Sequence, residues 1–580
     1  MIDPQKSTAA VMPSESPHAA ARPTSSRLAL LATLLAIAAV ACGSIIQSTI
    51  ADPWLNVLFV LVLLLPVLRG ELGRQHSWLQ QYDQGYRRAL LVAGLGWALV
   101  TACLYLVQIR PFIGDVDLFY YLCNARDMNN HSLTSNDCYS YFPGVYSFWR
   151  TVMLTVGQRL EAIQWTYLLV ILTNVLLVAA IVWRHSRCLA SSLFAGCWLL
   201  VLASRFQATA GETELLATIP LLGAILYWSG QPLRGNRGWR YSLALGIGLA
   251  LTLYAKQQAG LLALGALALL LSYRWRSKAD QHQLRLLIAI PVMAVVLFLV
   301  AILMAGEGWQ PLKIGLATVA DYESEGSWWF NLYVQLRRDE TAALAALFSG
   351  LVLAACCWRK EPRSAESLRS LEVILFLAIG ALFTLCQLRS RAYHHYMLLA
   401  IPGLVISSVL LWREVFPARV EGQRKTALLR SALILLIFVP FLRDAGIRES
   451  FTVWRIPRST NFAPRQLWHQ QSPVAKDLQQ LPGSPGETLY VVPARHNSVY
   501  FVLQTQTSSP RGYRFKQLPL AETDWSVHSR VLLLKPPAWD ASDQQLISPE
   551  VLIQWRAALQ QAGFQAEREL PTMVLYQRAP

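Results

Sequence analysis

Two aspartates stand two residues apart in a polar segment between long apolar runs. Asp115 and Asp117 lie in the stretch 114–121, within a loop that extends from residue 110 to about 159. A carboxylate there can take a proton from an acceptor hydroxyl, or bind a cation that neutralises a leaving phosphate. Asp115 is therefore the candidate general base, and the candidate metal ligand if the site uses Mg²⁺ or Mn²⁺.

The spacing of the two aspartates predicts different roles for them. In an extended loop they point to opposite faces, and in a helix they diverge by about 200°. We therefore expect one of the pair to be structural. Asp117 is a candidate N-cap for a short amphipathic helix over 118–128 that lies on the membrane surface.

Three further polar clusters stand at the ends of apolar runs, where ionisable side chains are costly and usually functional. They are Arg205 with Glu212 and Glu214; Lys256 with Gln257; and Arg389, Arg391, His394, His395 and Tyr396. Arg forks and Lys point charges match phosphate, so these clusters predict binding of an anionic headgroup. The structural alternative is that the cations snorkel to the interface. The turn around Lys256 is only a few residues long, so it holds Lys256 close to the bilayer, which argues against snorkelling there.

The elements that position these clusters are membrane helices. The chain is 54% hydrophobic and 15% charged, whereas soluble proteins carry roughly 25% charged residues. Apolar runs near the length that spans a bilayer predict about thirteen transmembrane helices. The runs lie at 28–46, 54–68, 89–109, 161–183, 188–204, 214–229, 241–254, 259–273, 286–304, 341–358, 371–388, 395–412 and 428–445.

The charge pattern orients these helices. The net charge is +16, and alternate loops carry roughly twice as many Lys and Arg as the others, which is the positive-inside pattern. This places the N-terminus in the cytoplasm, with a disordered tail at 1–27, and excludes nucleic acid as the expected partner. The first run is longer than a signal-peptide core, so we expect a retained helix. The transmembrane domain then spans 28–445, with extracytoplasmic loops at 110–160 and 305–340.

The last part of the chain has a different composition. Short β-rich runs appear at 488–493, 498–503, 530–534 and 571–577, and a helical run at 549–562 ends at Gly563. This mixture predicts a small extracytoplasmic α/β domain over 446–580.

Tyrosines and cysteines in the first loop have structural interpretations. Tyr120 and Tyr121 are candidates for substrate contact, or members of the aromatic belt at the membrane interface. Cys123 and Cys138 lie in a compartment that permits disulfides, and a bridge closing about 15 residues would contribute roughly 3 kcal/mol.

These stretches together resemble the GT-C superfamily of glycosyltransferases, most closely the bacterial protein O-mannosyltransferase and aminoarabinose transferase-like group. The likeness is carried by Gly-Asp-Val-Asp-Leu-Phe-Tyr-Tyr at 114–121, Tyr-Ala-Lys-Gln-Gln-Ala-Gly at 254–260, His-His-Tyr-Met-Leu-Leu-Ala-Ile-Pro at 394–402, and the start of the C-terminal domain at 489–513. Many members have an adjacent Asp-Glu where this chain has Asp-Val-Asp, so the identity of the base stays open.

The resemblance implies a function. The chain would move a sugar from a polyprenyl-phosphate-linked donor to a lipid, glycan or protein acceptor outside the cytoplasm, in a bacterial inner (plasma) membrane. Asp115 would act as base or metal ligand. The other residues would bind the substrates: Lys256, Arg389 and Arg391 the lipid phosphate, and Glu212, Glu214, His394 and His395 the sugar or the acceptor.

Two other classes of function remain open from the sequence. A lipid or solute transporter, such as a flippase, would also have many helices with charges near the bilayer. The long acidic loops, the C-terminal domain and the lack of a two-fold repeat argue against it. A non-catalytic scaffold of envelope assembly would have no need of Asp115.

Overall fold

All residues that the computed structural model describes belong to one compact unit, Leu64–Pro580. They are residues 116–127, 143–158, 160–186, 192, 195–196, 198–199, 202–203, 213–229, 238–276, 281–304, 327, 329–330, 350, 365–387, 394–415, 473–481, 487–493, 496–508, 523–536 and 549–579.

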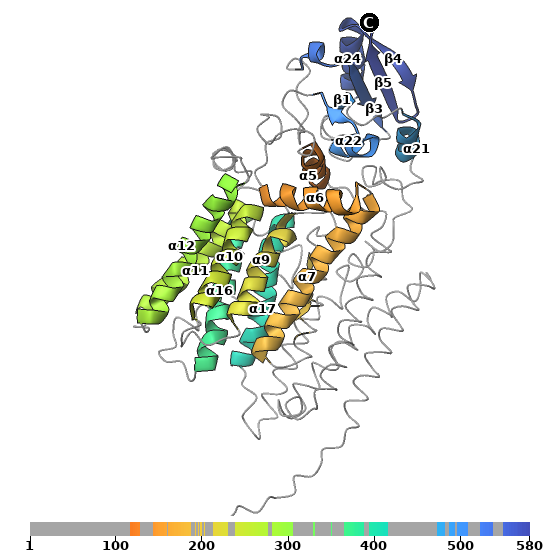
Figure 1. The fold of residues 1–580 in the computed structure, drawn as a ribbon. Helices are drawn as coiled ribbons and strands as arrows, with labels where there is room; N and C mark the ends of the chain where they lie inside the picture. The colour runs from red at the N-terminus through yellow and green to blue at the C-terminus, as the bar shows by residue number, and fades with distance from the viewer. Residues whose placement is uncertain are drawn as a thin grey trace, which may run out of the picture. The chain divides into compact units, whose positions relative to one another are not determined.

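Long helices make up the first part of the described chain (Figure 1). They are α6 (Pro143–Val156), α7 (Leu160–Ser186), α9 (Thr213–Trp228), α10 (Gly238–Ala255), α11 (Gln257–Arg276), α12 (Gln281–Met304), α16 (Ala365–Gln387) and α17 (Met397–Val415). α10 packs against α9 and α12, α16 against α17 and α11, and α7 against α9 and α17.

These helices confirm the apolar runs that fall on them. The predicted runs at 161–183, 214–229, 241–254, 259–273, 286–304, 371–388 and 395–412 each coincide with a helix, and the described positions between 192 and 203 are also helical. The other predicted runs lie outside the described residues, apart from position 350, so the total of about thirteen spans stays a prediction.

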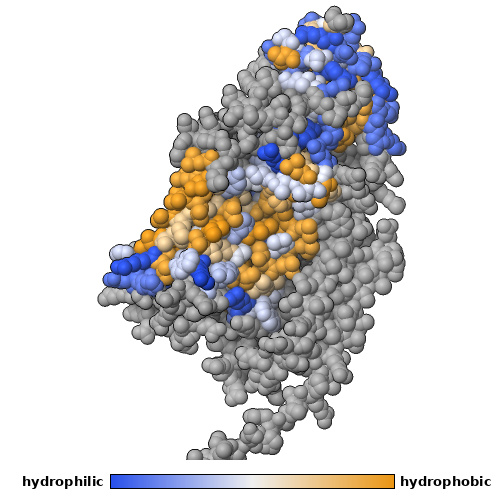
Figure 2. Space-filling view, in the orientation of Figure 1, coloured by the Kyte–Doolittle hydropathy of each residue, from blue (hydrophilic) through white to orange (hydrophobic). Residues whose placement is uncertain are grey.

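Apolar side chains cover the outer face of the helical part. Two described stretches are long and apolar enough to cross a membrane, Leu169–Ser186 and Leu284–Leu303. On α12, Val292 is 58% exposed, Val296 52% and Leu303 55%, a stripe at helical spacing. Figure 2 shows this apolar surface over the helices and hydrophilic residues over the C-terminal part. A stripe of this kind suits lipid contact, as the topology predicts.

The predicted short helix in the first loop exists, and it is buried within the protein. α5 (Val116–Asp127) packs against α6 on one side and against α22 (Asn497–Leu503) of the C-terminal domain on another. All its residues from Leu118 onward are buried. α5 begins at Val116, so Asp117 lies in its first turn. The amphipathic interpretation did not anticipate that the helix is buried and packs against α22.

A five-stranded mixed sheet forms the C-terminal domain, with strand order β2-β1-β3-β5-β4. The strands are β1 (Thr488–Val492), β2 (Gln506–Thr507), β3 (Arg530–Leu534), β4 (Phe564–Glu569) and β5 (Met573–Arg578). β1 runs parallel to β2 and β3, and β5 is antiparallel to both β3 and β4. Helices α21 (Pro473–Gln480), α22 and α24 (Pro549–Gln561) accompany the sheet.

Most of the predicted elements of this domain are confirmed. The runs at 488–493, 530–534 and 571–577 are strands, and α24 ends before Gly563, whose φ of 82° suits a glycine cap. The prediction of a strand at 498–503 is wrong, because that run is α22. Its buried residues are Val499, Tyr500 and Leu503, which is helical spacing, whereas Val502 is 39% exposed.

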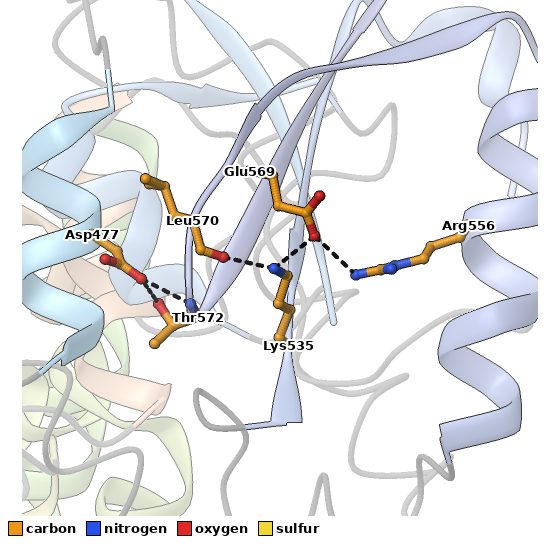
Figure 3. A network of polar contacts seen from close by, with 6 residues as sticks. All are labelled: Asp477, Lys535, Arg556, Glu569, Leu570 and Thr572. Carbon is orange, nitrogen blue, oxygen red and sulfur yellow. Dashed lines mark hydrogen bonds and ion pairs between the residues drawn. The ribbon is translucent and has the colours of Figure 1, made fainter.

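A polar network holds the turn between β4 and β5 (Figure 3). The buried Asp477 of α21 accepts hydrogen bonds from Thr572 N (2.8 Å) and Thr572 Oγ1 (2.6 Å). Lys535 Nζ donates to Leu570 O (2.7 Å) and to Glu569 Oε1 (2.9 Å). The hydrogen bond from Lys535 lowers the pKa of Glu569, whose carboxylate is exposed.

Asp477→Ala should loosen this turn. Thr572 N–H would remain buried without its acceptor, which costs about 1–3 kcal/mol. Hydrogen exchange of the full chain should show faster exchange in β5. Glu569→Gln is the control, because an exposed ion pair contributes little, and it should leave exchange unchanged. Equal loss of protection in the two variants would contradict this assignment.

The disulfide prediction can be tested on the α5 cysteine. Cys123 is buried, and burial raises the pKa of its thiol to about 12; Cys138 lies outside the described residues. Alkylation must therefore be done on denatured protein, followed by peptide mapping. We expect peptides containing Cys123 and Cys138 to be modified only after reduction. Modification of both without reductant would reject the bridge.

Candidate active site

A one-residue break between two helices holds Lys256 at the centre of the candidate site. α10 ends one residue before it and α11 begins one residue after it. Its N–H donates to the Thr252 carbonyl (2.8 Å), and its carbonyl accepts from Gly260 N–H (3.2 Å). Gly260 permits this sharp junction, because a Cβ there would lie 2.7 Å from Leu253 Cα. The turn is as short as predicted, and it keeps Lys256 only 3% exposed.

The Lys256 ammonium group is paired with a carboxylate from the first turn of α9. It forms an ion pair with Glu214, which is fully buried, and donates to Thr213 Oγ1 (3.3 Å). Nζ also lies 5.6 Å from the centre of the Tyr396 ring. Each buried ion costs several kcal/mol of desolvation, so the two charges depend on each other and on these polar contacts.

Two buried polar atoms beside this ion pair have no hydrogen-bond partner among the described residues. They are Glu214 Oε2 and Gln257 Nε2. Most buried polar atoms in folded proteins are hydrogen-bonded to protein or water. Orphaned atoms beside a buried charge pair therefore indicate a place that water or a ligand completes.

The start of α17 brings an aromatic pair to the same place. A short 3₁₀ helix, η2 (His394–Tyr396), leads directly into α17. The rings of His395 and Tyr396 meet edge to face with centroids 4.7 Å apart. Tyr396 thus lies beside both Lys256 and His395, and the start of α17 contributes to the cluster.

The first loop reaches the junction through α6. Gly144 of α6 is pressed against the end of α10, where a Cβ would lie 2.8 Å from Ala255 Cα. Ser147 Oγ and Tyr254 Oη are 3.3 Å apart. α5 in turn packs on α6, with the Tyr121 and Tyr146 rings edge to face at 5.9 Å. The segment that begins beside Asp115 in the sequence is thereby packed onto the Lys256 junction.

A small cavity lies deeper among the same helices. Its volume is ≈ 50 Å³, and its walls include Thr218 of α9, Thr252 of α10, Ala259 of α11 and Leu399 of α17. Each of these residues stands about one helical turn from a member of the polar cluster. Most of the remaining wall is apolar and comes from α16 and α17. The cavity is therefore mostly apolar, and its wall contains neighbours of the cluster residues but not those residues themselves.

The structure unites part of the predicted site. It brings together Glu214 of α9, Lys256 at the break between α10 and α11, Gln257 of α11, and His395 and Tyr396 of η2. Asp117 lies on α5, but its side chain is outside the described part, as is that of His394. The positions that lie wholly outside the described residues are Asp115, Arg205, Glu212, Arg389 and Arg391.

Tyr120 and Tyr121 are not members of an interfacial belt. Tyr120 is 7% and Tyr121 5% exposed, because α6 and the C-terminal domain enclose α5. Their rings pack edge to face at 5.7 Å. Whether either touches a substrate stays a prediction.

The metal prediction rests on Asp115, outside the described part of the chain. Within that part, His, Cys, Asp and Glu side chains form no group of three or more that could hold a metal ion.

Three participants were missed by sequence reasoning. Thr213 binds Lys256, and its position beside Glu214 was the available signal. Gly144 lies within the predicted loop at 110–159. Its close contact with the backbone at the end of α10 joins residues far apart in sequence, which no local pattern encodes. Arg126 of α5 is buried and bonded to the C-terminal domain, a contact between residues far apart in sequence.

The chain resembles known proteins in structure. No protein-family model matches the chain, and no curated protein matches it by sequence. The crystal structure of ArnT from Cupriavidus metallidurans bound to undecaprenyl phosphate matches with a TM-score of 0.53 at 12% identity, covering 86% of this chain and 100% of ArnT. The apo form of ArnT matches with a TM-score of 0.52.

A third structure is less similar. Mycobacterial arabinofuranosyltransferase AftD has a TM-score of 0.47 at 15% identity, and the match covers 83% of this chain and 40% of AftD. The chain therefore has the fold of the GT-C glycosyltransferases, which are integral membrane enzymes.

Proposed function

We propose that this chain is a glycosyltransferase that moves a sugar from a polyprenyl-phosphate donor to an acceptor on the extracytoplasmic side of the membrane. The observation that carries the proposal is the buried ion pair of Lys256 with Glu214 beside Tyr396, held at the ends of apolar helices in a chain with the fold of ArnT. A cation at the end of apolar helices suits a phosphate attached to a hydrocarbon chain. Undecaprenyl phosphate, the ligand of the ArnT crystal structure, is such a molecule.

The cluster would bind the phosphate by exchanging partners. Lys256 is already neutralised by Glu214, so a phosphate would compete with that carboxylate for the ammonium group. Arg389 and Arg391, a few residues before Tyr396 in the sequence, would supply further charge. Glu214 Oε2 and Gln257 Nε2, the two orphaned atoms, would then hydrogen-bond a sugar or acceptor hydroxyl. Arg205, Glu212, His394 and His395 would complete this polar wall.

The proposed reaction is a displacement at the anomeric carbon. Asp115 takes the proton of the acceptor hydroxyl, whose oxygen forms a bond to that carbon. The bond from the carbon to the phosphate oxygen breaks, and the electron pair leaves with the polyprenyl phosphate. The cations stabilise the charge that develops on the phosphate. Asp117 lies in the first turn of α5, where a carboxylate stabilises the helix. We assign the base to Asp115 because it is the first acid of the stretch 114–121, which resembles the catalytic-loop motif.

Asp115→Asn should abolish transfer while the chain still folds. Loss of a general base costs about 10²–10⁴-fold in rate. The assay measures release of undecaprenyl phosphate by purified protein from a panel of synthetic undecaprenyl-phosphate hexoses and aminopentoses. Mass spectrometry of cell glycolipids with and without the chain identifies the natural product.

Asp117→Asn is the matched control for this experiment, because it makes the same chemical change two residues away. We expect it to reduce the rate only a few-fold, through helix stability. The opposite order of the two variants would transfer the role of base to Asp117. Full activity in both would remove this segment from the chemistry.

Lys256→Ala should be destabilising as well as inactive. It leaves the Glu214 carboxylate buried without a counter-charge, which costs about 3–5 kcal/mol. The double variant Lys256→Met with Glu214→Gln removes both charges and should restore stability, measured by thermal unfolding in detergent. It should still fail to bind undecaprenyl phosphate in native mass spectrometry. Binding like that of the unmodified chain would show that Lys256 is not the phosphate ligand.

A further inference from the structure

The C-terminal ends of two helices meet at one buried side chain. Arg126 lies in the last turn of α5 and is 4% exposed. Its guanidinium donates from Nη1 to Tyr500 O (3.0 Å) and from Nη2 to Thr505 O (2.6 Å). Nε donates to Asp127 Oδ1 (3.0 Å). A single cation therefore joins the segment after Asp115 to the C-terminal domain.

The two carbonyls that Arg126 binds belong to the C-terminal cap of α22. Gln504 has a φ of 55°, in the left-handed region, and Thr505 N donates to Tyr500 O (3.1 Å). This is the long-range bond of a Schellman cap. Helix C-termini carry partial negative charge, which favours a cation. Arg126 is thus held by helix geometry as well as by two hydrogen bonds.

α22 is also bound to the sheet of the C-terminal domain. Tyr500 Oη accepts a hydrogen bond from Val491 N of β1 (2.8 Å), and the Tyr500 ring is buried. The same residue therefore binds β1 through its side chain and Arg126 through its carbonyl. A displacement of α22 relative to the membrane helices would have to break one of these contacts.

α5 is also connected, through α6, to the candidate site. It packs on α6, and α6 contacts the α10–α11 junction through Gly144, against which any side chain would clash. Continuous contacts thus extend from β1 through Tyr500 and Arg126 to α5, and from α6 to the Lys256 junction. Asp115 immediately precedes α5 in the sequence.

We infer that Arg126 is a positioning residue through which the C-terminal domain fixes α5, and with it the segment that carries Asp115. The inference rests on the proposed function for its effect on turnover. The planar guanidinium makes two divergent bonds to fixed carbonyls, which the single ammonium of lysine cannot reproduce with the same geometry. Small displacements of a catalytic group have large effects on rate, on the order of 100-fold for about 1 Å.

The experiment compares three variants of the full chain. Arg126→Met removes the contact, and Arg126→Lys keeps the charge without the fork. Arg578→Met is the matched control, because Arg578 also donates to two backbone carbonyls, Ser526 O and Ala562 O, but both lie within the C-terminal domain. Three quantities are measured: hydrogen exchange along the chain, binding of undecaprenyl phosphate alone, and its release from the panel of sugar donors.

Arg126→Met should raise hydrogen exchange in both α5 and α22, with β3 and β5 still protected. Its kcat should fall about 10–100-fold, while undecaprenyl phosphate binds within about threefold of the unmodified chain because Lys256 is untouched. Arg126→Lys should recover part of the loss. Arg578→Met should keep kcat and the protection of α5. Unchanged exchange in α5, or unchanged kcat in Arg126→Met, would overturn the inference.

The two proposals fail in different ways. If the unmodified chain releases no undecaprenyl phosphate from any donor, the proposed function is contradicted, yet increased exchange of α5 in Arg126→Met would still support the coupling. If the unmodified chain is active and Arg126→Met loses phosphate binding as severely as turnover, Arg126 supports the whole fold and is not a positioning residue.

Discussion

The candidate site depends on one buried ion pair, Lys256 with Glu214. Neither charge is stable alone among apolar helices, because a carboxylate or an ammonium group out of water costs several kcal/mol. The pair therefore ties the start of α9 to the junction of α10 and α11, and Tyr396 joins α17 to the same point. The polar cluster therefore joins helix ends that also pack against one another.

Helix positions could be predicted from the sequence because lipid imposes a simple rule, an apolar run for each span. The pairing of Lys256 with Glu214 could not, since 42 residues separate them and no local pattern records which helix ends meet. The run 498–503 was misread because valine, tyrosine and phenylalanine favour strands. In the structure this run is a helix. It packs against α5, and Tyr500 Oη accepts a hydrogen bond from Val491 N.

The first polar loop also illustrates how tertiary contacts change an interpretation. Its sequence is typical of a surface segment, with aspartates, tyrosines and an arginine. In the structure its helix is enclosed between α6 and the C-terminal domain, and Arg126 binds helix carbonyls in place of water or phosphate. The α/β domain therefore contacts the segment that follows Asp115 in the sequence.

The contact of Gly144 with Ala255 has a consequence for how the chain can diverge. The backbone of α6 touches the backbone at the end of α10 there. The distance between them is therefore independent of side-chain size as long as residue 144 is glycine. Such a contact does not depend on which side chains surround it, but any side chain at position 144 would collide with the backbone of residues 254 and 255.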